Sequence, residues 1–205
     1  MQDEQTNPPK HFIAGVVLDQ DVSRFINLLQ LSLPEIQSVA VVLGPESARL
    51  LPELEVAVAK QGWQLNAHIL TAQDQPLRVL NQLYANSDVM LVLPDRAVFN
   101  QRLAKLVIAL STRHRVPVMA YSKAYTQVGA LFSVYSTPDK IGQQTARIAI
   151  QYLDGKLNKK GQILTPEGFG ISINRSVERV LKTGIKDEQA LSTELQKREI
   201  EEKLK

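Results

Sequence analysis

Seven residues able to recognise a small molecule follow three apolar segments of the chain. They are Gly44, Glu46 and Ser47 after "SVAVVL", Asp95 and Arg96 after "DVMLVLP", and Ser122 and Tyr125 at and after the end of "VPVMAYS". A glycine before a helix permits close approach to a bound group, and the helix N-terminus attracts an anion such as a carboxylate. A carboxylate can accept hydrogen bonds from an ammonium group, and a tyrosine offers a flat apolar ring with a hydroxyl. This chemistry suits a small polar or zwitterionic ligand.

Each of these positions also has a purely structural interpretation. Residues 44–47 could form a capped turn, and Asp95 could cap a helix that starts at Ala97. Tyr125 could pack in a hinge. A fourth group of polar residues, 135–137, is largely explained if Thr137 caps the following helix.

The sequence offers no catalytic or metal-binding constellation. There are no cysteines, and the three histidines lie far apart in unrelated contexts, at positions 11, 68 and 114. Neither a G-x-S-x-G nor a G-x-G-x-x-G motif occurs, and Gly44 is not followed by a Walker lysine. We therefore expect a non-enzymatic protein without a cofactor or a metal.

Apolar segments that alternate with amphipathic helices must position these residues. Strands are predicted near residues 38–43, 64–70, 88–93 and 116–121, because each segment is rich in apolar residues and a helical pattern separates it from the next. The pattern predicts an α/β fold, a three-layer sandwich with a mostly parallel, doubly wound sheet. Ligands of such sheets bind beyond the carboxyl ends of the strands, where the seven residues lie.

The two ends of the chain follow other patterns. An apolar run at 12–18 predicts a strand, with Asp21 as the N-cap of the next helix. No helix is predicted in the linker 123–128, so strand 129–135 is expected to leave the main sheet before a helix that starts at Pro138. Residues 162–174 predict one or two short strands, and 175–181 a short helix.

Composition narrows the expected partners of the protein and describes its two terminal segments. The net charge of +3 is small and no basic stripe occurs, so nucleic acid is not an expected partner. No apolar run reaches the length of a membrane span, and the first residues lack the features of a signal peptide. Residues 1–10 are expected to be a disordered tail. Residues 186–205 are charged and contain only a sparse stripe of apolar residues. This pattern predicts a solvated or partner-supported helix rather than a core element.

The order of motifs resembles that of ABC-type transporter substrate-binding proteins with two flavodoxin-like lobes, the type I periplasmic binding fold. The segments that carry the resemblance are "LSLPEIQSVAVVLGPES", "DVMLVLPD", "VPVMAYS", "VGALFSVYSTPDKIGQQTARIAIQYLDGK" and "ISINRSVERVLKTGI". They are most similar to the tryptophan- and tyrosine-type branch and cover about residues 12–185. Members of that family carry a first lobe ahead of the Leu-Pro segment, and most of it is not found in this chain.

The resemblance implies a function, a location and a domain plan. It implies a solute-binding protein, or one lobe of it, that binds an amino acid or a similar small molecule and works with an ABC permease in the periplasm or cell envelope. It places 11–185 in one binding-protein-like domain, with 36–122 as the main lobe and 129–155 as a remnant of the other lobe. The alternative is a ligand-free interaction module that self-associates or binds an envelope partner.

Strand 129–135 also predicts an assembly. It is apolar on both faces, and its expected neighbour within the chain is strand 12–18, which gives only a marginal two-stranded patch. An uncovered apolar edge favours pairing, so we expect a homodimer that buries 12–18 and 129–155. In the alternative, this strand joins the edge of the main sheet and the protein stays monomeric.

Overall fold

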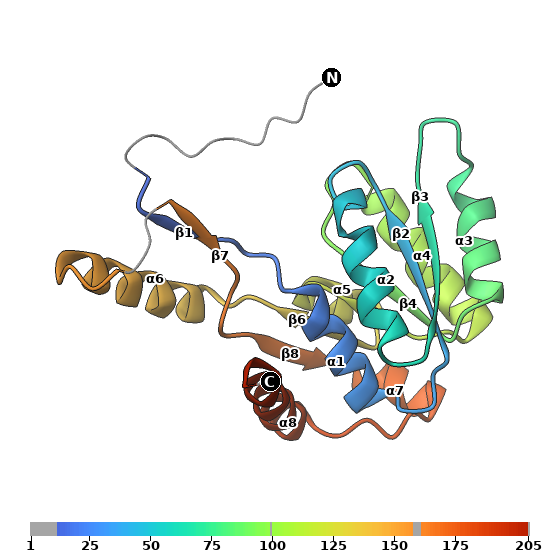
Figure 1. Cartoon of the computed structure of the whole chain (residues 1–205). Helices are drawn as coiled ribbons and strands as arrows, with labels where there is room; N and C mark the ends of the chain where they lie inside the picture. Colours follow the sequence, from blue (N-terminus) through green and yellow to red (C-terminus); the bar gives the residue numbers. More distant parts are fainter. Residues whose placement is uncertain (1–11, 99, 158–160, 205) are drawn as a thin grey trace.

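The main part of the molecule is a six-stranded sheet. The computed structural model describes residues 12–98, 100–157 and 161–204. The strand order is β3-β2-β4-β5-β6-β8, and all neighbours are parallel except the antiparallel pair β6–β8 (Figure 1). The strands are β2 (Ser38–Leu43), β3 (Gln64–Ile69), β4 (Val89–Val92), β5 (Val118–Ala120), β6 (Phe132–Tyr135) and β8 (Gly170–Ile173). The predicted mostly parallel α/β sandwich is confirmed.

Helices cover both faces of this sheet, which explains why its central strands β2 and β4 are almost entirely apolar. One core contains Val39 and Val41 of β2 with side chains of α1 (Val22–Ser32), α2 (Leu51–Ala59) and α8 (Glu188–Lys203). The other contains Ala40 and Val42 of β2 with side chains of α3 (Pro76–Ala85), α4 (Gln101–His114) and α5 (Lys123–Val128). Successive residues of a strand point to opposite faces, so both sets must be apolar. A 3₁₀ turn (Ala48–Leu50) precedes α2, and α7 (Arg175–Leu181) follows β8.

The expectation that strand 129–135 leaves the main sheet is wrong. The linker 123–128 forms helix α5, and β6 pairs with β5 in parallel. The connection succeeds because Gly129 adopts a φ of 125°, a conformation that L residues rarely take, and turns the chain directly back into the sheet. Since β6 lies between β5 and β8, the argument that an orphaned strand requires a dimer is also wrong.

The C-terminal helix contributes to the core, contrary to expectation. Leu191 and Leu195 of α8 are fully buried and join the core beneath α1. The sparse apolar stripe suffices because polar side chains complete the contact of α8 with α1: Glu199 accepts from Arg24 and Glu202 accepts from Asn27. Ile200 and Leu204 are exposed.

Some predicted helix starts are displaced, and a few expectations cannot be compared. Asp21 is the N-cap residue of α1 but makes no capping hydrogen bond, and before α3 Asp74 closes a turn by accepting from Thr71. Helix α4 begins at Gln101, capped by Asn100.

The predicted tail 1–10 and His11 lie outside the described residues. None of the described helices is long and apolar enough to cross a bilayer.

Three elements form an arm that projects from the main domain. Strands β1 (Ala14–Val16) and β7 (Gln162–Leu164) pair in parallel as a separate two-stranded sheet, and α6 (Pro138–Leu153) packs against β1 (Figure 1). Thr137 caps α6 as predicted. We call β1, β7 and α6 the arm. The assignment of 36–122 and 129–155 to two lobes stays a prediction, although β6 belongs to the main sheet.

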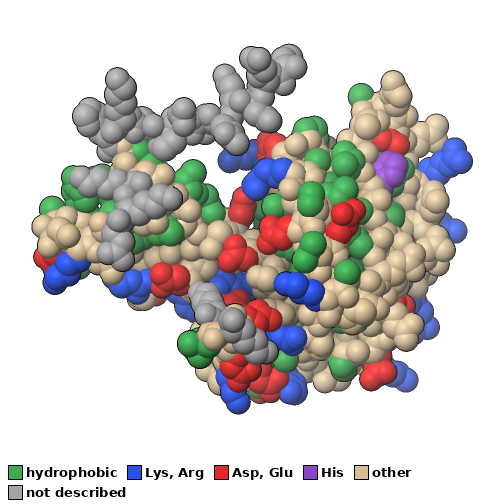
Figure 2. All heavy atoms as spheres, viewed as in Figure 1, with side chains coloured by type: hydrophobic (Ala, Val, Ile, Leu, Met, Phe, Trp, Pro, Cys, Tyr) green, Lys and Arg blue, Asp and Glu red, His purple; other side chains and the backbone are tan. Residues whose placement is uncertain are grey.

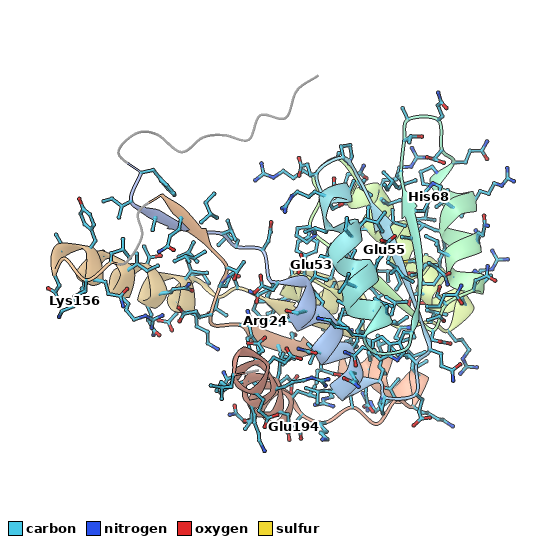
Figure 3. All side chains as sticks on the ribbon, in the orientation of Figure 1. Arg24, Glu53, Glu55, His68, Lys156 and Glu194 are labelled. Carbon is cyan, nitrogen blue, oxygen red and sulfur yellow. The ribbon has the colours of Figure 1, made fainter. Side chains whose placement is uncertain are left out.

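A buried arginine joins the arm to the main domain. Arg24 of α1 donates to both carboxylate oxygens of Glu199 on α8, at 2.5 and 2.8 Å, and to the carbonyl oxygen of Pro166, at 2.7 Å. Its guanidinium also stacks 4.7 Å from the Phe169 ring centroid. Pro166 and Phe169 lie in the connection from β7 to β8, so Arg24 fixes this connection against α1 and α8 (Figure 3).

Candidate functional site

The carboxyl ends of three adjacent strands bring the seven predicted residues to one edge. Strands β2, β4 and β5 are neighbours and parallel, so the loops that follow them meet. The arm starts at this same edge, because β6 ends at Tyr135 and continues into α6. In Figure 2 the surface is hollowed between the arm and the main domain, and acidic and basic side chains border the hollow.

Asp95 ties the loops after β2 and β4 together. Its Oδ2 accepts from the backbone N–H and the hydroxyl of Ser47, at 2.8 and 2.7 Å, and its Oδ1 accepts from the N–H groups of Ala97 and Val98. Burial opposes ionisation, but the hydrogen bonds from Ser47 and from these N–H groups hold the pKa of the Asp95 carboxyl below its ordinary value. Because these donors occupy both oxygens, Asp95 supports the site and has little capacity left for an ammonium group.

Gly44 and Ser47 have packing roles in the same network. A Cβ on Gly44 would lie 2.2 Å from Val98 Cγ2 and 2.6 Å from Asp95 Oδ2, so only glycine fits. The Ser47 hydroxyl accepts from the Gly44 N–H at 2.9 Å while it donates to Asp95, and the Ser47 residue is 1% exposed. The capped-turn interpretation of residues 44–47 therefore agrees with the geometry.

Glu46 and Arg96 are the predicted residues that carry accessible charge. Both side chains are exposed and lie on adjacent loops. The backbone N–H of Arg96 donates to Glu46 Oε2 at 3.4 Å. Within the described part of the chain, neither the Glu46 carboxylate nor the Arg96 guanidinium forms an ion pair. The edge thus presents one exposed carboxylate and one exposed guanidinium on adjacent loops.

Two tyrosines form the wall after β5. The Tyr121 and Tyr125 rings lie 5.5 Å apart between centroids, tilted by 57°. Burial raises the pKa of both tyrosine hydroxyls. For Tyr121, the hydrogen bond with Tyr125 lowers the pKa, whereas the carboxylate of Asp19 raises it further. Tyr125 is buried and Tyr121 is half-buried, so Tyr121 is the ring available at the edge. Ser122 occupies the N-cap position of α5 without a capping bond.

Asp19 and Tyr121 are therefore site candidates that the predicted set omitted. Tyr121 ends the apolar run before Ser122, and Asp19 follows the first strand. The rule that selected the other residues, a polar group just beyond a strand, would have selected both. The sequence pattern draws attention to Asp21 instead, because that residue fits the N-cap of the following helix.

A separate cavity lies beside this edge. It measures about 620 Å³ and lies between α3 and α4, lined mainly by apolar side chains that include Leu70, Pro76, Leu77, Leu103 and Leu106. None of the seven predicted residues lines it. The described residues contain no cluster of histidines and carboxylates able to hold a metal.

Comparison with known proteins agrees with this architecture. The family model described as "ABC transporter substrate binding protein" matches residues 3–197. A search of curated proteins gave no match.

Solved structures show the same fold. A conserved domain protein from Vibrio cholerae is 23% identical with a TM-score of 0.66, and the match covers 87% of this chain and 60% of that one. An ABC domain from Streptococcus pneumonia in complex with L-Trp is 16% identical with a TM-score of 0.61, covering 83% and 59%. A substrate-binding protein with adhesive properties from Clostridium difficile, in a ligand-free, open structure, is 20% identical with a TM-score of 0.68, covering 85% and 59%. This chain therefore spans about three-fifths of these proteins.

Proposed function

Since this chain belongs to the ABC transporter substrate binding protein family, we propose that it binds a small zwitterionic solute, such as an amino acid, at the edge formed by the loops after β2, β4 and β5. The observation that carries the proposal is the unpaired charge of Glu46 and Arg96 on adjacent loops. The L-Trp complex of the pneumococcal structure supports the choice of ligand class.

The proposed roles divide the seven predicted residues, together with Tyr121, into contacts and supports. Arg96 would bind the ligand carboxylate, and Glu46 its ammonium group. Tyr121 and Ser122 would line the side of the ligand, with Tyr125 behind them. Gly44, Ser47 and Asp95 would hold the two charged loops in place. No bond is made or broken, so the protein binds without catalysis.

The family also suggests a setting. We propose that the protein acts in the periplasm or cell envelope and delivers its ligand to an ABC permease. The arm would form one side of the ligand site, because it starts at the same edge as the charged loops.

Thermal stability with a panel of ligands tests the proposal. An amino acid at one hundred times its dissociation constant should add about 2.7 kcal/mol to the free energy of unfolding. N-acetyl amino acids lack the ammonium group, and amino acid amides lack the carboxylate, so both should stabilise the protein less. A panel without any stabilising amino acid would contradict the proposal.

Two variants separate the charges. Loss of a hydrogen bond to a charged group costs about 1.5–3 kcal/mol, so Arg96→Met should weaken amino acid binding at least tenfold and abolish the preference over the amide. Glu46→Gln should abolish the preference over the N-acetyl compound. Glu55→Gln, an exposed carboxylate on α2, is the matched control and should change neither (Figure 3).

A second candidate function is an interaction module. The exposed apolar side chains of the arm favour it, among them Ile150, Leu153 and Ile163. Binding of no ligand, combined with self-association, would select this function over solute binding.

A further inference from the structure

The layer formed by helices α3, α4 and α5 carries only basic charge. These helices cover one face of the main sheet, and their sequences contain no aspartate or glutamate. The exposed basic residues of this layer, including the C-cap residue of α4, are Arg78, Arg102, Lys105, Arg113, Arg115 and Lys123. We call these six residues the basic face. The fold gathers them from positions spread over 78–123, so they do not form a run of charge in the sequence.

The opposite layer has a different balance of charge. There α2 carries Glu53 and Glu55, and α8 is rich in glutamate. Lys197 and Arg198 of α8 each lie within 4.0 Å of a glutamate one turn later. By contrast, none of the six residues of the basic face forms an ion pair with any described residue. The charge of the basic face is therefore available to a partner.

Helix α4 forms the centre of the basic face. Arg102, Lys105 and Arg113 lie on its exposed side together with Ala109 and Thr112, at the spacing of one helix face. By the rise of an α-helix, the stripe from Arg102 to Arg113 is about 16 Å long. The neighbouring helices α3 and α5 widen the stripe, and basic side chains border the main domain on the side of α3 in Figure 2.

Exposed apolar side chains lie among these charges. Leu77 of α3 is 54% exposed and lines the cavity between α3 and α4 together with Arg102. Towards the C-terminal end of α4, Val128 of α5 is 62% exposed and lines a second cavity, of about 610 Å³, together with Arg113 and Arg115. The basic face therefore combines cationic groups with aliphatic side chains at both ends of α4.

The acidic residues nearest to the basic face are engaged by other groups. Among the described residues that line the two cavities, Asp74 is the one acid. Its Oδ2 accepts from the N–H and the hydroxyl of Thr71, at 2.8 and 2.7 Å, and its Oδ1 lies 3.1 Å from His68 Nε2. Glu178 of α7, the helix that borders the second cavity, accepts from the Gly184 N–H at 3.2 Å. These contacts leave the cations of the basic face without an acidic neighbour to neutralise them.

We propose that the basic face is a docking surface for an anionic phospholipid membrane, with α4 lying along the plane of the membrane. Lysine and arginine attract anionic headgroups, and neighbouring aliphatic side chains enter the headgroup region, as in helices that lie on membranes. Nucleic acid fits less well, because its phosphates offer nothing to Leu77 and Val128. The described aromatic residues of these helices that could stack on bases, Tyr84 and Tyr125, are buried. The proposal does not depend on solute binding.

Co-sedimentation of the full chain with lipid vesicles tests this docking surface. At about 0.1 M salt the chain should bind vesicles of phosphatidylglycerol and phosphatidylcholine in equal parts, and it should bind pure phosphatidylcholine at least tenfold more weakly. Salt at about 0.5 M should release the chain, because salt screens exposed charges. A chain that does not bind the mixed vesicles, or that binds both kinds equally, would overturn the proposal.

A triple variant of α4 locates the surface. Each basic side chain near an anionic membrane strengthens binding roughly fivefold, so removing three should weaken binding to the mixed vesicles about a hundredfold. Glutamine has a helix propensity similar to that of arginine and lysine, so the melting temperature should stay unchanged. The variant combines Arg102→Gln, Lys105→Gln and Arg113→Gln.

The matched control removes three exposed basic residues from the opposite layer. It combines Arg49→Gln, Lys60→Gln and Lys197→Gln, so the two triple variants have the same net charge. The control should bind the mixed vesicles within about threefold of the unmodified chain, because its charges lie away from the proposed surface. Equal losses in the two triple variants would mean that net charge, and not the basic face, attracts the membrane, and would overturn the proposal.

A fluorescent probe reports which layer meets the lipid, since the chain contains no cysteine. Val128→Cys on α5 and Val56→Cys on α2 replace valines that are 62% and 56% exposed, in opposite layers. With an environment-sensitive fluorophore attached, the first should shift its emission to shorter wavelengths on the mixed vesicles and the second should not. A shift at both positions, or at position 56 alone, would contradict the proposed orientation.

Two other polyanions decide whether the partner is a membrane. A short DNA duplex and poly-L-glutamate carry negative charge without an apolar phase. Both should bind more weakly than the mixed vesicles and leave the emission of the labelled Val128→Cys variant unchanged. Tighter binding of the duplex or of poly-L-glutamate would overturn the membrane as the partner, in favour of nucleic acid or an acidic protein respectively.

Discussion

The main domain and the arm use the same kinds of elements with opposite results. The main sheet has helices on both faces, and its strands β2 and β4 are almost entirely buried. The arm has two three-residue strands and one helix, and large apolar side chains on β7 and α6 remain exposed. A two-stranded sheet is marginal in isolation. The comparison indicates that the main domain supplies most of the stability, whereas the arm depends on its junction with the main domain.

Matched isoleucines give the largest expected contrast. Ile26 of α1 is 1% exposed and Ile163 of β7 is 63% exposed. Ile26→Ala should lower the free energy of unfolding by about 4 kcal/mol, because it leaves a cavity in the core. Ile163→Ala should cost less than about 1 kcal/mol. Urea denaturation followed by circular dichroism measures both, and equal losses would mean that the arm is buried in solution.

The junction between the arm and the main domain should give the next largest loss of stability. Arg24→Ala removes the partner of Glu199 and of the Pro166 carbonyl oxygen in a buried setting, so it should cost about 3 kcal/mol. Arg147, which pairs with Glu167 on the surface, is the control, and Arg147→Ala should cost less than about 1 kcal/mol.

Proteolysis would show whether Arg24→Ala acts on the arm. We expect faster cleavage in the connection from β7 to β8 than in the unmodified chain, since Arg24 holds that connection against α1 and α8. Similar losses of stability for both arginine variants would contradict the role assigned to the junction.

The sequence predicted the main domain better than the arm for a physical reason. Continuous apolar strands such as 38–43 are apolar because both faces are buried, so their pattern shows their environment. The path of residues 123–135 depends on one six-residue helix and on the positive φ of Gly129, which the apolar pattern does not record. In α8, the many charged residues around two buried leucines made the sequence pattern indicate a solvated helix rather than a core element.

The candidate site was predictable in position but not in detail. The rule that polar residues follow parallel strands located all seven residues on one edge. It could not separate Glu46 and Arg96, which face solvent, from Asp95 and Ser47, whose polar atoms bond to each other. That difference depends on side-chain direction, which becomes known only from three-dimensional contacts.

Glycine substitutions sharpen the comparison at the level of single atoms. Gly44→Ala in the main domain should destabilise the protein by about 2 kcal/mol, because its Cβ would overlap Val98 and Asp95. Gly142→Ala at an exposed position of α6 should stabilise the helix by up to about 1 kcal/mol, because its Cβ meets nothing within 4 Å. Thermal denaturation in dilute solution gives both signs, and two changes of the same sign would contradict this account of packing.

Asp95→Asn should give a small loss of stability that depends on pH. The hydrogen bonds of the folded protein lower the pKa of Asp95 below the unfolded value of about 3.9, despite its burial. The ionised carboxylate therefore stabilises the folded state above about pH 4, and this contribution is lost as the pH falls through the folded pKa. At pH 7 the variant should be less stable by about 1–2 kcal/mol, because the amide offers one acceptor oxygen where the carboxylate offers two.

Below pH 4 the difference between the two proteins should shrink, since the protonated carboxyl also loses an acceptor. Urea denaturation at pH 7, 5, 4 and 3 measures the difference directly. A gap that stays constant or grows on acidification would mean that the charge of Asp95 does not hold the loops after β2 and β4 together. The positions of Glu46 and Arg96 would then need another explanation, because those loops carry both residues.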